Sequence, residues 1–165
     1  MLTHPLLGAL ALALIALPLV ACGSSSASGS DGGGGSAPTS LCDTDPRAMT
    51  YAVGLSQTAT GGALTVSFVN ADPAPPVENP NTWTVKVTDA NGAPVTGATI
   101  TVKPFMPDMG HGSSITPQIT PMATAGMYQI TLLDLFMPGI WTNTFTITTA
   151  SEPVQTVVFT FCIDG

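Results

Sequence analysis

The sequence predicts an all-β fold, an immunoglobulin-like antiparallel β-sandwich of about seven strands. Runs rich in Val, Ile, Thr and aromatic residues follow one another from residue 63 onward, as expected of short strands. Turns that contain Pro or Gly separate these runs. No stretch after residue 40 combines a helical apolar period with capping residues. Short strands without intervening helices are typical of two packed sheets.

The segment before this domain has the pattern of an export signal. Residues 6–20 are an almost unbroken apolar run, long enough for a signal-peptide core and short for a transmembrane helix. The run ends in Leu19-Val20-Ala21-Cys22, which resembles the lipobox of bacterial lipoproteins. That resemblance implies a signal peptide over residues 1–21, acylation of Cys22, and a location in the cell envelope facing the periplasm or the exterior. An uncleaved membrane anchor is the alternative.

A flexible tether is expected after the anchor. Residues 22–40 are mostly Gly, Ser and Ala, a composition that buries too little apolar surface to order itself. Its root-mean-square reach would be about 20–25 Å. The remainder, residues 41–165, has the size of one ordinary domain with one core.

The individual strands follow from composition and alternation. In the second predicted strand Trp83, Val85 and Val87 share one face, and the other face carries Thr and Lys. The later aromatic residues alternate in the same way with Thr, so we expect Trp83, Trp141, Phe145 and Phe159 to lie in the core. The predicted strands are 63–69, 82–88, 98–103, 127–133, 140–148 and 154–162, with 114–120 as a further candidate.

Two cysteines remain once Cys22 is assigned to lipid. Cys42 and Cys162 stand at the two ends of the domain, and an even pair in an exported chain predicts a disulfide. A thiol pair that binds metal, or two free thiols, are the alternatives.

The charge pattern argues against several partners. Ten acidic residues stand against Arg47, Lys86 and Lys103, so there is no basic patch for a nucleic-acid backbone. An acidic surface also has little affinity for anionic headgroups, and acyl chains would have to provide membrane attachment.

The segment 105–112 concentrates soft metal ligands. Met106, Met109 and His111 lie within six residues, and thioether sulfur with neutral imidazole suits copper, Cu(I) above all. Thioethers also stay competent in an oxidising compartment, where a dithiol would form a disulfide. Asp108 would add an oxygen donor better suited to Cu(II). The alternative is that the methionines pack over the end of the sandwich and His111 caps a turn.

Strand direction extends this candidate site to Met137. If strand 82–88 runs up and the tight turn at Asn91-Gly92 reverses the chain, the segment after strand 98–103 lies at the bottom. Taking 114–120 as an upward strand returns the chain to the bottom at 134–139. Met106, Met109, His111 and Met137 then share one end, and Met122 lies at the other.

Several blocks resemble a known family. Thr88 to Ile100 contains a D-x-x-G-x-P-V-x-G-A turn, Met106 to Gly112 reads MPDMGHG, and Met137 to Trp141 reads MPGIW. In this order they resemble the YtkA-like domain, which is related to FixH-type proteins. The resemblance implies an exported or membrane-attached β-sandwich, often found in copper-handling or respiratory-oxidase contexts. It supplies no catalytic residues.

Two function classes follow. The first is a lipid-anchored module that holds or passes Cu(I), and the second is a structural or protein-interaction module of an envelope complex without metal. We do not expect an enzyme, because the chain after Cys22 has one histidine and no recognisable nucleophile and base arrangement.

Overall fold

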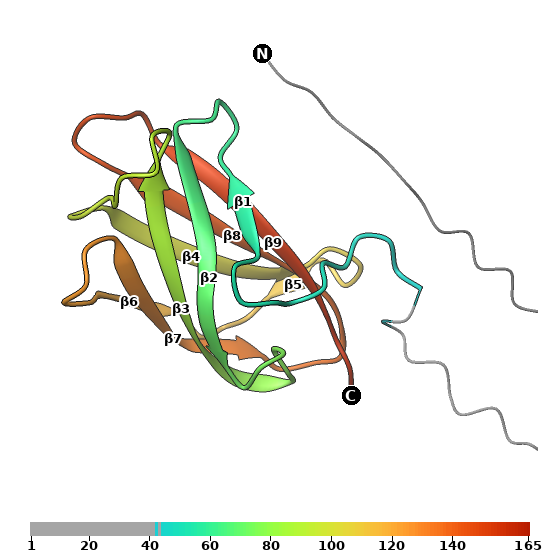
Figure 1. Cartoon of the computed structure of the whole chain (residues 1–165). Helices are drawn as coiled ribbons and strands as arrows, with labels where there is room; N and C mark the ends of the chain where they lie inside the picture. Colours follow the sequence, from blue (N-terminus) through green and yellow to red (C-terminus); the bar gives the residue numbers. More distant parts are fainter. Residues whose placement is uncertain (1–41, 43) are drawn as a thin grey trace, which may run out of the picture. The chain divides into compact units, whose positions relative to one another are not determined.

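The computed structural model describes residue 42 and residues 44–165, and the described part of the chain forms nine β-strands in two antiparallel sheets. The five-stranded sheet has the order β1-β2-β3-β7-β6, and the four-stranded sheet has the order β5-β4-β8-β9. Figure 1 shows the two sheets packed face to face. The predicted all-β sandwich is confirmed. The strands are β1 Ser56–Thr58, β2 Leu64–Asp72, β3 Asn79–Asp89, β4 Thr99–Met106, β5 His111–Gly112, β6 Gln118–Pro121, β7 Met127–Leu135, β8 Gly139–Thr148 and β9 Gln155–Ile163.

The six firmly predicted strands correspond to β2, β3, β4, β7, β8 and β9. The further candidate at 114–120 corresponds to β6, which is shorter and begins at Gln118. Neither β1 nor β5 was predicted, because strands of three and two residues are too short to show an alternating pattern. The signal peptide, Cys22 and the linker to residue 40 lie outside the described residues.

The turn after β3 connects the two sheets and is not a hairpin. Strands β3 and β4 belong to different sheets, although they do run in opposite directions as predicted. The carboxylate of Asp89 accepts hydrogen bonds from the backbone N–H groups of Asn91 and Ala93, at 2.9 and 2.8 Å. Gly92 adopts a φ of +80°, which the absence of a side chain permits.

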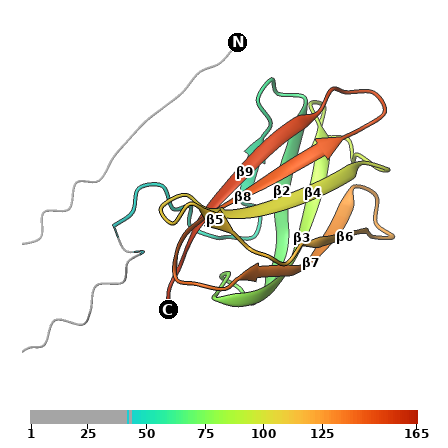
Figure 2. The ribbon, with the colours of Figure 1, turned by 180° about the vertical axis from the view of Figure 1, so that it is seen from behind.

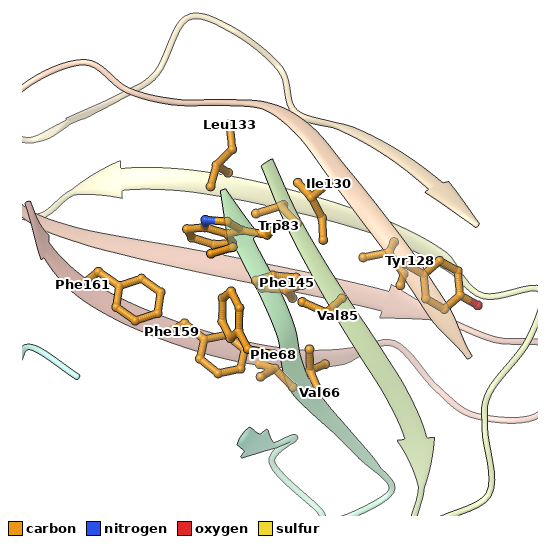
Figure 3. Close-up of a cluster of buried hydrophobic side chains, with 14 of the residues drawn as sticks. Val66, Phe68, Trp83, Val85, Tyr128, Ile130, Leu133, Phe145, Phe159 and Phe161 are labelled. Atoms are coloured by element: carbon orange, nitrogen blue, oxygen red, sulfur yellow. The ribbon is translucent and has the colours of Figure 1, made fainter. Parts of the chain in front are cut away.

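Inward-facing residues of both sheets form one core (Figure 3). The four aromatic residues predicted for the core, Trp83, Trp141, Phe145 and Phe159, are all fully buried. Phe68 lies at the centre, with its ring 4.9 Å from that of Phe159 and 5.0 Å from that of Trp83. Burial of large side chains of this kind provides most of the stabilisation of a small sandwich.

The structure contains the predicted disulfide between Cys42 and Cys162, whose Cα atoms are 5.2 Å apart. It joins the start of the described domain to the end of β9. Met49 strengthens this connection, since its backbone N–H donates to the Thr160 carbonyl at 2.8 Å. In the part of the chain that the structure covers, no helix is long and apolar enough to cross a membrane.

Candidate functional site

The MPDMGHG segment forms a hairpin at the end of β4. The backbone N–H groups of Met109 and Gly110 donate to the carbonyl of Met106, at 3.3 and 2.9 Å. Gly110 adopts a φ of +70°, a left-handed conformation that glycine adopts without strain. The chain therefore reverses over residues 107–110 and returns as β5.

The hairpin register places Met106 and His111 directly opposite each other in the β4–β5 ladder. Residues opposite each other in an antiparallel pair point to the same face, with Cβ atoms about 4.5–5.5 Å apart. Met106 is buried at 1% exposure, and His111 is half-buried.

Gly112 allows β5 to approach β4 closely. A Cβ atom built on Gly112 would lie only 2.5 Å from the carbonyl oxygen of Pro104. Any other residue would push β5 away from β4 and separate His111 from Met106.

The loop between β7 and β8 faces this hairpin. The ring of Phe136 stacks on His111 with centroids 5.6 Å apart and an interplanar angle of 22°. The carbonyl of Met137 accepts a hydrogen bond from Trp141 Nε1 at 2.9 Å. The Met137 side chain is partly buried and packs against the core. A Cβ on Gly139 would lie 2.8 Å from the Met106 methyl group. Met137 is therefore held beside the hairpin by the chain on both sides of it.

The four predicted ligands share one end of the sandwich but not one cavity. Met106 and Met109 line a pocket of about 210 Å³, together with Asp45, Asp108 and four further residues. His111 lines a different groove of about 480 Å³. Met109 is 59% exposed at the hairpin tip.

Met122 lies at the opposite end of the five-stranded sheet, as the strand directions predict. Its backbone N–H donates to the Met127 carbonyl at 2.9 Å, in the turn that joins β6 to β7.

Arg47 bridges the two carboxylates that line the methionine pocket. Arg47 donates to both carboxylate oxygens of Asp108 at 2.7 Å and also pairs with Asp45 at 2.7 Å (Oδ2). These hydrogen bonds lower the pKa of both carboxyl groups below their ordinary value of 3.8, and in return raise the pKa of Arg47. Both oxygens of Asp108 thus accept hydrogen bonds from Arg47, and a metal ion at Asp108 would have to compete with this ion pair.

Thioethers would have to dominate any metal site here. Among the described residues, no group of three His, Cys, Asp or Glu side chains is placed to hold a metal ion. The soft donors at this end are the sulfur atoms of three methionines and one imidazole, a set that suits Cu(I), and the carboxylates of the pocket, Asp45 and Asp108, are paired with Arg47.

Replacing Arg47 with Gln is expected to raise the pKa of both Asp45 and Asp108 toward 3.8. The pKa values of both carboxyl groups are lower in the folded than in the unfolded state. The ion pairs with Arg47 therefore stabilise the fold fully at a pH above 3.8, the ordinary pKa. This stabilisation is lost as the pH falls through the lowered pKa values. Below about pH 4 the wild-type protein should therefore lose more stability than Arg47→Gln. Side-chain carboxyl NMR shifts followed against pH provide the measurement.

Lys86→Gln is the matched control, since Lys86 is an exposed cation on β3 with no ion pair inside the described region. Carboxyl pKa values that stay unchanged in Arg47→Gln would contradict the assignment.

Neither Arg47 nor Phe136 stood out in the sequence as part of the site. Arg47 and Asp108 are separated by 61 positions, and nothing in either local sequence connects them. Phe136 could have been noticed, since it directly precedes the Met-Pro-Gly block of the facing loop.

Comparison with protein families matches residues 58–146, more than half of the chain, to the family described as YtkA-like. No curated protein matches the chain. Among solved structures, the chain is similar to the crystal structure of a DUF4426 family protein from Pseudomonas aeruginosa PAO1. The two are 19% identical, the similarity covers 65% of this chain and 94% of the other, and the TM-score is 0.49.

Proposed function

This chain belongs to the YtkA-like family, and we propose that its sandwich is an exported, lipid-anchored domain that holds or passes Cu(I). The proposed ligands are Met106, Met109, His111 and Met137. The observation that carries the proposal is the β4–β5 register, which sets Met106 and His111 opposite each other on one face.

The surroundings of this pair support a soft-ligand site. Met109 is exposed where an incoming ion would first meet the protein, and it shares its pocket with Met106. Cu(I) favours such thioethers, which need no deprotonation before they bind. To join the other donors, Met106 would have to turn its sulfur from the core toward the pocket that it already lines.

The proposed location rests on the sequence before residue 41. The lipobox-like Leu19 to Cys22 segment would supply an acyl anchor, and the Gly/Ser-rich linker would hold the domain clear of the headgroups. The disulfide between Cys42 and Cys162 supports an oxidising compartment, in which disulfides persist.

Titration of the purified protein with Cu(I) against a competing chelator tests the proposal. We expect one ion bound with a dissociation constant tighter than about 1 µM, near −8 kcal/mol of binding free energy. Met106→Leu, Met109→Leu and His111→Phe remove the donor atoms and keep the shape of the side chains, and together they should weaken binding by at least about 100-fold.

Met122→Leu is the matched control, since Met122 is a partly exposed thioether at the opposite end. It should leave the affinity unchanged. A dissociation constant weaker than micromolar, or an equal loss in Met122→Leu, would contradict copper binding.

A protein-docking role is the second candidate. It is favoured by the exposure of two large apolar side chains at the same end, Met109 and Phe136, because exposed apolar groups often mark contact sites. In this case Met109→Leu would leave copper uptake unchanged, whereas Met109→Glu would abolish cross-linking to an envelope partner.

A further inference from the structure

Strand β4 has a largely unpaired outer edge. Strand β5 pairs only with Phe105 and Met106, and β8 occupies the other side of β4 from Thr99 to Phe105. Among the described residues, no strand pairs with positions 99–104 on the outer side, and Figure 2 shows β4 at the margin of its sheet. Such an edge presents unpaired backbone N–H and C=O groups that can pair with another chain.

A groove runs beside this edge. It has a volume of about 480 Å³ and lies between β4 and the segment that leads from β5 to β6. Val102, Pro104 and Pro117 give it buried apolar walls, and Ile115 is 42% exposed at its side. An added strand could therefore pair with the β4 backbone and bury alternate side chains, as in recognition by strand addition.

The charge of the groove indicates which kind of segment could bind there. Lys103 is exposed on its wall and forms no ion pair within the described part of the chain. None of the residues that line the groove is acidic, although the whole chain has ten acidic residues and only three basic ones. Lys103 is thus a cation without an acidic neighbour in the groove lining, and it is complementary to an anionic segment.

We propose that the outer edge of β4 binds an extended acidic segment of another protein as an added β-strand. A second copy of this chain is a poor occupant, because each copy has a net charge of −7 and the copies repel each other. His111, a proposed copper ligand, also lines this groove, but the proposed pairing uses the β4 backbone and Lys103 and does not require bound copper.

The test uses the full chain, labelled with ¹⁵N and kept in detergent, and a synthetic peptide of alternating Val and Thr that contains two Glu. We expect amide shifts to change at residues 99–103, since Pro104 has no amide proton. A peptide with Lys in place of Glu should bind about three- to tenfold more weakly, and Lys103→Glu should reverse this preference. Lys86→Glu, on the five-stranded sheet, is the matched control and should leave the preference unchanged.

A third peptide, N-methylated at alternate backbone amides, separates strand addition from simple charge attraction. It should lose binding, because N-methylation removes the donors that pair with β4. The proposal is overturned if the methylated peptide binds equally well, or if the β4 amides do not respond to the acidic peptide. It is also overturned if these amides shift with protein concentration alone, which would identify a second copy as the occupant.

Discussion

Replacing both Cys42 and Cys162 with Ala is expected to lower the free energy of unfolding by about 4–5 kcal/mol. The bond closes a loop of 120 positions, and on the chain-entropy model so long a loop strongly restricts the unfolded chain. Urea unfolding of the wild type and the variant, followed by the fluorescence of the buried tryptophans, gives the difference.

Single replacements provide the control for this experiment. Cys42→Ala and Cys162→Ala should each cost as much as the double replacement, since either one removes the same bond. If the two single variants lose different amounts of unfolding free energy, packing around one sulfur, and not the crosslink, accounts for the difference. Unfolding free energies equal to that of the wild type would contradict a stabilising disulfide.

The disulfide also affects the candidate site. The segment that it ties down carries Arg47, which holds Asp108 at the rim of the methionine pocket. Losing the bond should therefore free this segment and raise the pKa of Asp108 toward its ordinary value, the same direction expected for Arg47→Gln.

Replacing Phe68 with Ala is expected to destabilise the domain by about 3–5 kcal/mol. Phe68 is buried at 1% exposure, and Figure 3 shows its ring between β2 and the aromatic residues of β9. It makes edge-on contacts with the rings of Tyr51, Trp83, Phe159 and Phe161. Removing it leaves a cavity that rigid aromatic neighbours cannot fill.

Two comparisons make this result specific. Phe68→Leu keeps part of the volume and should lose clearly less stability than Phe68→Ala. Val53→Ala changes a side chain that is 71% exposed and should shift stability by no more than about 0.5 kcal/mol. Equal losses in Phe68→Ala and Val53→Ala would show that Phe68 is not central to the core.

The strands could be predicted because their signal is local. Alternation of Trp83, Val85 and Val87 with polar residues fixes which face of β3 is buried, and the structure confirms it. The short strands β1 and β5 have no such signal, because their pairing partners and not their own residues make them strands. The pairing of β3 with β7, and not with β4, likewise depends on contacts between distant segments.

Part of the candidate site could likewise be predicted from local sequence, and part depends on the tertiary structure. Counting strand directions correctly placed Met106, Met109, His111 and Met137 at one end. The opposition of Met106 and His111 depends on the hairpin register, and Gly112 permits it by allowing the close approach of two strands. The separation of His111 from the methionine pocket appears only when the side chains are placed.

The sequence by itself determined the sandwich class, the buried faces, the pairing of Cys42 with Cys162 and the gathering of soft donors at one end. Each of these depends on residue type and on spacing along the chain. Only the tertiary structure decided that Arg47 occupies both oxygens of Asp108 and that β4 has an unpaired edge beside Lys103. The physical reason is that ion pairs and sheet edges join residues far apart in sequence, whose approach is set by packing of the whole core.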